Sequence, residues 1–129
     1  MTDPSAIDKL LAHARSNLDR VPVEDLADEV AGGAILIDIR PLEQRRRDGD
    51  MPGAVVIDRN VLEWRLDPTS PDRLPIATGT DVRLIIVCNE GYSSSLAAHT
   101  LQMLGLVNAT DLIGGYQAWR RTVTESLDP

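Results

Sequence analysis

Short apolar runs without polar alternation are separated by helical stretches throughout this 129-residue chain. The apolar runs, which we interpret as strands, are residues 34–38, 55–57, 84–87 and 109–113. A strand that is apolar at successive positions needs cover on both faces, and a parallel sheet between helix layers provides that cover. The expected helical segments are residues 5–18, 24–31, 41–47, 60–65, 94–104 and 116–123, with a Pro-, Asp- and Ser-rich loop at 67–80. We therefore predict an α/β fold, a three-layer sandwich in which helices flank a central, mostly parallel sheet of four to five strands.

The composition is that of an ordinary globular domain, with 43% hydrophobic and 26% charged residues. No apolar run approaches the roughly 18 residues of a membrane span, so we expect no membrane partner. The net charge of −7 argues against nucleic acid as a partner. The N-terminus lacks the basic and apolar regions of a signal peptide, and a single cysteine suits a reducing compartment, so we expect a cytoplasmic protein. The sequence leaves the oligomeric state open.

The single cysteine, Cys88, lies between the apolar run at 84–87 and the predicted helix at 94–104. A short turn that opens a helix directs several backbone N–H groups into one small bowl. Amide dipoles and the helix N-terminus favour negative charge, so a sulfur at the base of that bowl would be held as the thiolate. Ligands bind at the carboxyl ends of the strands in open α/β sheets. We therefore predict that Cys88 is a nucleophile and not an inert core cysteine.

Four stretches, in this order and spacing, resemble the single-domain rhodanese-like sulfurtransferase family. They are Asp38-Ile39-Arg40, residues 49–54 (Gly-Asp-Met-Pro-Gly-Ala), residues 88–94 (Cys-Asn-Glu-Gly-Tyr-Ser-Ser) and residues 112–119, with Gly114-Gly115 and Trp119. Members of that family share an Asp-x-Arg after the first core strand, a Gly-His-Ile-Pro-Gly-Ala run, a Cys-x-x-Gly-x-Arg/Ser-Ser loop and a late Gly-Gly-x-x-x-Trp. Asp50 stands where the family usually has His, and Met51 where it usually has Ile; we regard both as tolerated. We expect an N-terminal helical extension at residues 1–19 and a rhodanese-like domain at residues 20–129.

The resemblance implies a sulfurtransferase that moves a sulfane sulfur from a donor to a thiol acceptor through a persulfide on Cys88. Splitting the transfer into two covalent steps makes each one easier. The loop expected to bind substrate and persulfide, through its backbone N–H groups and the hydroxyls of its two final serines, consists of Asn89, Glu90, Gly91, Tyr92, Ser93 and Ser94. The partners would be a small-molecule or protein sulfur donor and a thiol acceptor. No metal and no cofactor is implied beyond the covalent cysteine persulfide.

Charged residues around this loop are expected to tune the choice of donor. At roughly 6 Å and an effective dielectric constant of about 20, two unit charges repel by about 3 kcal/mol, and salt reduces this. Glu90 should therefore make the dianion thiosulfate a poor donor and favour persulfide donors. Arg59, Trp64 and Arg65 follow the apolar run at 55–57 and are expected at the rim of the pocket. Asp38 and Arg40 are expected to make structural bonds beneath it.

Three other functions compete with sulfur transfer, and the sequence argues against the first of them. A cysteine phosphatase needs an arginine to clamp the phosphoryl oxygens, and in those enzymes it comes six residues after the cysteine, where this chain has Ser94. A non-catalytic interaction module would use the same fold without the chemistry. A redox sensor would oxidise Cys88 to a sulfenic acid and then to a mixed disulfide with a partner.

Overall fold

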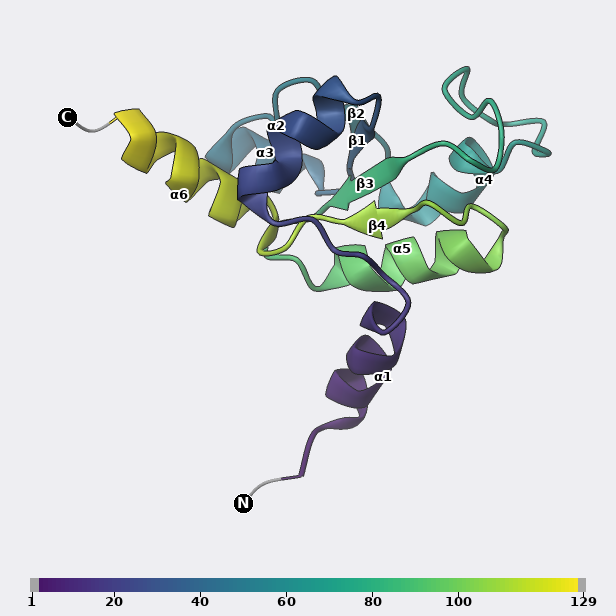
Figure 1. Cartoon of the computed structure of the whole chain (residues 1–129), viewed down its shortest axis with the longest axis horizontal. Helices are drawn as coiled ribbons and strands as arrows, with labels where there is room; N and C mark the ends of the chain where they lie inside the picture. The colour runs from purple at the N-terminus through teal and green to yellow at the C-terminus, as the bar shows by residue number, and fades with distance from the viewer. Residues whose placement is uncertain (1–2, 128–129) are drawn as a thin grey trace.

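The computed structural model describes residues 3–127 and has a sheet of four parallel strands between helical layers (Figure 1). The sheet order is β2-β1-β3-β4, and the strands are β1 (Ile35–Asp38), β2 (Val55–Val56), β3 (Leu84–Val87) and β4 (Thr110–Asp111). The helices are α1 (Ala6–Arg15), α2 (Val23–Ala31), α3 (Leu42–Asp48), the 3-10 turn η1 (Arg59–Val61), α4 (Leu62–Leu66), α5 (Ser93–Met103) and α6 (Gly115–Leu127). The predicted three-layer α/β sandwich is confirmed.

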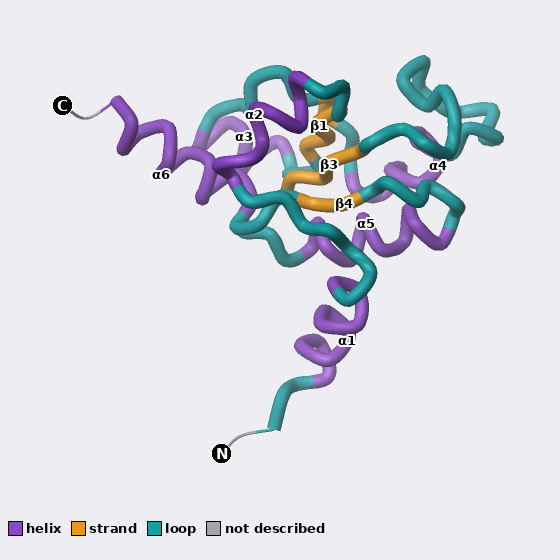
Figure 2. The backbone as a smooth tube through the Cα atoms, in the orientation of Figure 1, coloured by secondary structure: helices purple, strands orange, loops and turns teal. Residues whose placement is uncertain are grey.

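Both faces of the central strands are covered, which explains why those strands are apolar at successive positions. Ile37 and Ile86 share a core cluster with Leu101 of α5, on the face that α4 and α5 cover. Neighbouring positions of the same strands point the other way, and Ile85 joins the cluster that contains Leu26 of α2. The described residues 67–83 form the long loop between α4 and β3 (Figure 2), as their composition predicted.

One strand departs from the expected pattern, because β2 lies at the edge of the sheet. Val56 is 47% exposed, whereas Ile57, just beyond the strand, is buried. An apolar run therefore did not mean cover on both faces in this strand. The two edge strands, β2 and β4, are also shorter than the runs at 55–57 and 109–113 indicated.

The parallel register brings the carboxyl ends of β1 and β3 side by side. Asp38 is paired with Val87, and the N–H of Ile39 donates to the carbonyl of Val87 at 2.9 Å. Cys88 and Ile39 therefore leave the sheet side by side at the carboxyl ends of the two central strands. None of the helices in residues 3–127 combines the length and the apolar character needed to cross a membrane.

Helix α1 packs on α5 with only part of its length. Ser5 caps it, accepting a hydrogen bond from the N–H of Asp8 at 3.1 Å, as the Ser-x-x-Asp pattern favours. Leu11 is buried, and the ring of His13 meets His99 of α5 at a centroid distance of 5.4 Å. The N-terminal half of α1 projects past the body of the domain (Figure 1), and Ile7, one turn before the buried Leu11, is exposed.

Two neighbouring leucines on α1 test this docking. Leu11 is 9% exposed and Leu10 is 52% exposed. Leu11→Ala should lower the free energy of unfolding by about 2 kcal/mol, because it removes packed methyl groups. Leu10→Ala, the matched control, should change it by less than about 0.5 kcal/mol. Equilibrium urea unfolding measures both values, and equal losses would contradict the docking of α1 on α5.

Candidate active site

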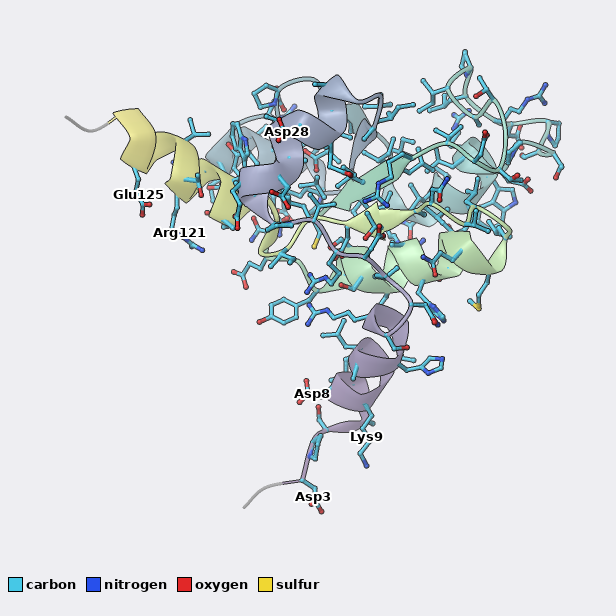
Figure 3. The ribbon with its side chains drawn as sticks, viewed as in Figure 1. Asp3, Asp8, Lys9, Asp28, Arg121 and Glu125 are labelled. Carbon is cyan, nitrogen blue, oxygen red and sulfur yellow. The ribbon has the colours of Figure 1, made fainter. Side chains whose placement is uncertain are left out.

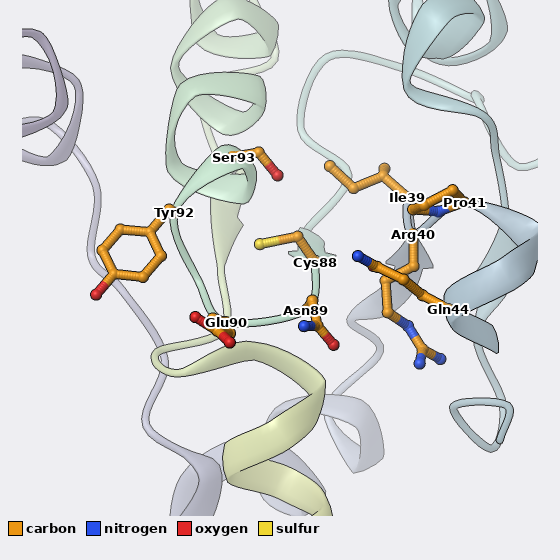
Figure 4. Close-up of a pocket in the computed structure, with 9 residues that line it drawn as sticks. All are labelled: Ile39, Arg40, Pro41, Gln44, Cys88, Asn89, Glu90, Tyr92 and Ser93. Atoms are coloured by element: carbon orange, nitrogen blue, oxygen red, sulfur yellow. The ribbon is translucent and has the colours of Figure 1, made fainter. Parts of the chain in front are cut away.

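The sulfur of Cys88 lies inside the loop that joins β3 to α5 (Figure 4). The backbone N–H of Gly91 donates to Cys88 Sγ at 3.1 Å, and the N–H of Ser94 donates to it at 3.3 Å. Donors aimed at one sulfur stabilise negative charge on it. Cys88 is only 5% exposed, yet it lines a pocket of about 320 Å³ that opens to the surface. The site therefore combines a stabilised sulfur with access for a small reactant.

Two chain segments line this pocket. The segment from Cys88 to the start of α5 supplies five residues. The segment from the end of β1 into α3 supplies the other four, which are Ile39, Arg40, Pro41 and Gln44 (Figure 4). Sequence reasoning missed Ile39, Pro41 and Gln44 as pocket residues. The signal that could have found them is their position directly after β1, because β1 and β3 are neighbours in the sheet and end at the same edge.

Glycines let the loop approach the segment after β4. Gly91 has φ +88°, and a Cβ there would lie 2.7 Å from the backbone nitrogen of Gly114. A Cβ on Gly115 would lie 2.5 Å from the carbonyl oxygen of Cys88. The N–H groups of Tyr116 and Gln117 then donate to the carbonyls of Cys88 and Asn89 at 2.9 Å and 3.0 Å. The first turn of α6 thus holds the loop from behind.

Asp111 holds the loop from a second side, and sequence reasoning missed it. Its fully buried carboxylate accepts hydrogen bonds from the hydroxyls of Ser94 and Ser95, both at 2.7 Å. It also forms an ion pair with Arg20 at 2.8 Å. The sequence signal that could have identified Asp111 is a carboxylate inside the apolar run at 109–113. The expectation that the Ser94 hydroxyl assists the sulfur is wrong, because that hydroxyl donates to Asp111; only the N–H of Ser94 reaches Sγ. Ser93 does line the pocket.

Asp38 and Arg40 form an ion pair at 2.8 Å with both side chains almost fully buried. Arg40 also donates to the carbonyl of Gly49 at 3.0 Å, and its guanidinium carbon lies 3.8 Å from the ring centroid of Tyr116. In Figure 4 the guanidinium points away from the Cys88 sulfur. Arg40 therefore lines the pocket, while its charged guanidinium is bonded to Asp38 and Gly49 beneath the pocket.

The structure does not place Arg59, Trp64 or Arg65 among the residues that line the cysteine pocket. Arg59 pairs with Glu63 at 2.8 Å, while Trp64 and Arg65 border a separate hollow together with Asp72. The expected rim at these three residues is therefore wrong. After β2 the chain turns into η1 and α4, which pack on the face covered by α5 and so carry these side chains away from the edge.

Glu90 lies at the mouth of the pocket. It is exposed, and it borders both the cysteine pocket and a second hollow that includes Arg47, Asp48 and Arg121. Tyr92 is also exposed at this mouth.

In the second hollow, the hydrogen bond from Arg47 lowers the pKa of the Asp48 carboxyl. No group of three potential metal ligands occurs within residues 3–127.

The fold and the cysteine loop define a rhodanese-like domain. Residues 22–122 match the rhodanese-like domain family, and the chain belongs to that family. Helix α1 lies before the matched region.

Two curated relatives carry sulfurtransferase names. The thiosulfate sulfurtransferase GlpE of Stutzerimonas stutzeri is 28% identical over 113 residues, which are 88% of this chain and 94% of GlpE. The adenylyltransferase and sulfurtransferase UBA4 of Candida albicans is 32% identical over 93 residues, which are 72% of this chain. The match spans only 21% of UBA4, so the chain corresponds to about a fifth of that protein.

Two solved structures share the fold. Human single-domain sulfurtransferase TSTD1 has a TM-score of 0.65 at 24% identity, with 79% of this chain and 95% of TSTD1 covered. A Rhodopseudomonas palustris protein of unknown function, described as a possible tyrosine phosphatase, has a TM-score of 0.83 at 32% identity, with 95% of each chain covered.

A pair of glycines tests the loop packing. Gly91 and Gly33 both have positive φ, at +88° and +109°, but nothing lies within 4 Å of a Cβ built on Gly33. Gly33→Ala should cost about 1 kcal/mol of stability and leave Cys88 alkylation unchanged. Gly91→Ala should also displace the loop from Gly114 and slow iodoacetamide alkylation of Cys88 at least about fivefold, because the N–H of residue 91 leaves the sulfur. Equal alkylation rates in the two variants would contradict this role of Gly91.

Proposed function

We propose that this protein is a sulfurtransferase that carries a sulfane sulfur as a persulfide on Cys88. The observation that carries the proposal is the pair of N–H donors, from Gly91 and Ser94, on a sulfur that borders an open pocket. Membership of the rhodanese-like family and the sulfurtransferase names of GlpE and UBA4 support it.

The reaction consists of two displacements at sulfur. The Cys88 thiolate attacks the outer sulfur of a persulfide donor, R–S–S⁻; the donor S–S bond breaks, and R–S⁻ leaves with its electron pair. The product is Cys88–S–S⁻. An acceptor thiolate then attacks the outer sulfur, forms its own persulfide and releases the Cys88 thiolate. The sulfur is held covalently throughout, so the proposed reaction needs no metal and no other cofactor.

The proposed donor is a small-molecule or protein persulfide, and the proposed acceptor is a thiol. Glu90 at the mouth repels the doubly charged thiosulfate more strongly than a singly charged persulfide. A reducing cytoplasm is the proposed compartment, because it supplies thiol acceptors and keeps Cys88 reduced.

A phosphatase is the second candidate, raised by the description of the R. palustris protein. Phosphoryl transfer needs cationic donors around the equatorial oxygens. Ser94 occupies the place of the clamping arginine, and the one guanidinium among the pocket-lining residues, that of Arg40, is bonded to Asp38. We therefore expect no turnover of p-nitrophenyl phosphate, and turnover that is lost in Cys88→Ser would favour the phosphatase.

The central test is a donor panel of thiosulfate, mercaptopyruvate and glutathione persulfide on the natural chain and on Cys88→Ser. We expect Cys88 to gain one sulfur atom by intact-protein mass spectrometry with at least one donor, followed by transfer to an added thiol. The variant should lose transfer by at least about 10³-fold, because it lacks the nucleophile. Equal rates in the two proteins would refute the proposal. Oxygen adducts alone would favour the redox sensor, and an unreactive cysteine would favour the interaction module.

Glu90→Lys tests the basis of donor choice. Replacing an exposed negative charge at the mouth by a positive one should raise kcat/KM for thiosulfate about fivefold and change kcat/KM for glutathione persulfide less. Glu125→Lys makes the same change at the far end of α6 (Figure 3) and should alter neither value. An unchanged thiosulfate rate in Glu90→Lys would show that this carboxylate does not govern donor choice.

A further inference from the structure

Two arginines converge on one carbonyl of the cysteine loop. Arg15 Nη2 donates to the carbonyl oxygen of Gly91 at 2.7 Å, and Arg20 Nη2 donates to the same oxygen at 3.0 Å. Arg20 is also ion-paired to the buried Asp111, so it belongs to the anchoring of the loop already described. Arg15 comes from the last turn of α1, outside the matched rhodanese-like region, and has no part in the reaction derived above.

Arg15 is itself held against the loop by further contacts. Its Nε donates to the hydroxyl of Ser95 at 3.0 Å, and its guanidinium carbon lies 5.6 Å from the ring centroid of Tyr92. Arginine presents several donors in a rigid planar fork, so one side chain can bridge Gly91 and Ser95 at once. The Arg15 side chain therefore connects helix α1 to the cysteine loop with a defined geometry.

The two hydrogen bonds to the Gly91 carbonyl determine the direction in which the N–H of Tyr92 points. No cis peptide bond occurs within residues 3–127, and in a trans peptide the C=O and N–H point in opposite directions. With the carbonyl turned toward Arg15 and Arg20, the N–H of Tyr92 points away from them. Tyr92 lies between Gly91 and Ser94, whose N–H groups already donate to Sγ, and it lines the pocket. An N–H that points away from the arginines can reach a second sulfur bound in that pocket.

The arginines also polarise the peptide that they hold. A hydrogen bond from a guanidinium is charge-assisted and stronger than a neutral one. Electron density drawn toward the carbonyl oxygen makes the N–H at the other end of the peptide a better donor. Both effects act on the outer sulfur of a persulfide more than on Sγ, which has its own two donors.

We propose that Arg15 is a positioning residue for sulfur transfer: from outside the matched domain it orients the Gly91–Tyr92 peptide so that the Tyr92 N–H stabilises the outer, negatively charged sulfur of the Cys88 persulfide. This inference deepens the proposed function and rests on it. It assigns the N-terminal helix a role in the chemistry and not only in packing.

The test compares Arg15→Met with Lys9→Met. Methionine keeps an unbranched stem and removes the donors, and Lys9 is exposed on the same helix, so both variants lose one positive charge from α1 (Figure 3). Single-turnover persulfide formation from glutathione persulfide should fall about tenfold in Arg15→Met, a smaller loss than removal of a complete oxyanion donor. Iodoacetamide alkylation of Cys88 should stay within about twofold, because it needs only Sγ. Lys9→Met should change neither rate, and Arg15→Lys should recover part of the persulfide rate.

The outcomes separate the inference from the proposed function. Unchanged persulfide formation in Arg15→Met, or an equal fall of persulfide formation and alkylation, overturns the positioning role. If the natural chain forms no persulfide with any donor, the proposed function fails, and amide hydrogen exchange of residues 91–94 then tests the contact itself. Faster exchange in Arg15→Met but not in Lys9→Met would support Arg15 as the brace of the loop, and unchanged exchange would overturn it.

Discussion

The site depends on a backbone-to-backbone contact between the loop after β3 and the loop after β4. Gly91 meets Gly114, and Gly115 meets the Cys88 carbonyl, at distances that leave no room for a Cβ. This contact lets the first N–H groups of α6 reach the loop carbonyls. On the outer side of the loop, the carbonyls of Cys88 and Asn89 accept hydrogen bonds from α6. On the inner side, the N–H groups of Gly91 and Ser94 donate to the sulfur, so the backbone groups on both sides have partners.

Charge is distributed unevenly around this loop. On the buried side Arg20 and Asp111 neutralise each other, and the carboxylate collects the hydroxyls of Ser94 and Ser95. On the open side Glu90 has no ion-pair partner in the described part of the chain. The buried charges hold the loop from behind, whereas the exposed charge lies at the mouth of the pocket.

Much of the fold could be predicted because burial on both faces leaves a direct mark on the sequence. The runs at 34–38 and 84–87 became the two central strands, and Cys88 stands at the end of one of them as expected. The edge strand misled the same reasoning, since Val56 is apolar and yet exposed. The prediction that Arg59, Trp64 and Arg65 line the pocket failed for another reason. The direction of the chain after β2 depends on how α4 packs against α5, and no local sequence pattern predicts that packing.

The sequence by itself determined the class of fold, the place of Cys88 at the end of a strand and the loop around it, because hydrophobic periodicity and a glycine-containing turn before a helix are local properties. Only the tertiary structure decided which distant residues meet the loop. Strand order brings Ile39, Pro41 and Gln44 to the pocket, β4 places Asp111 beneath the serines, and α1 places Arg15 on the Gly91 carbonyl. These contacts join residues up to 76 positions apart, and they exist only once the sheet order and the helix packing have been established.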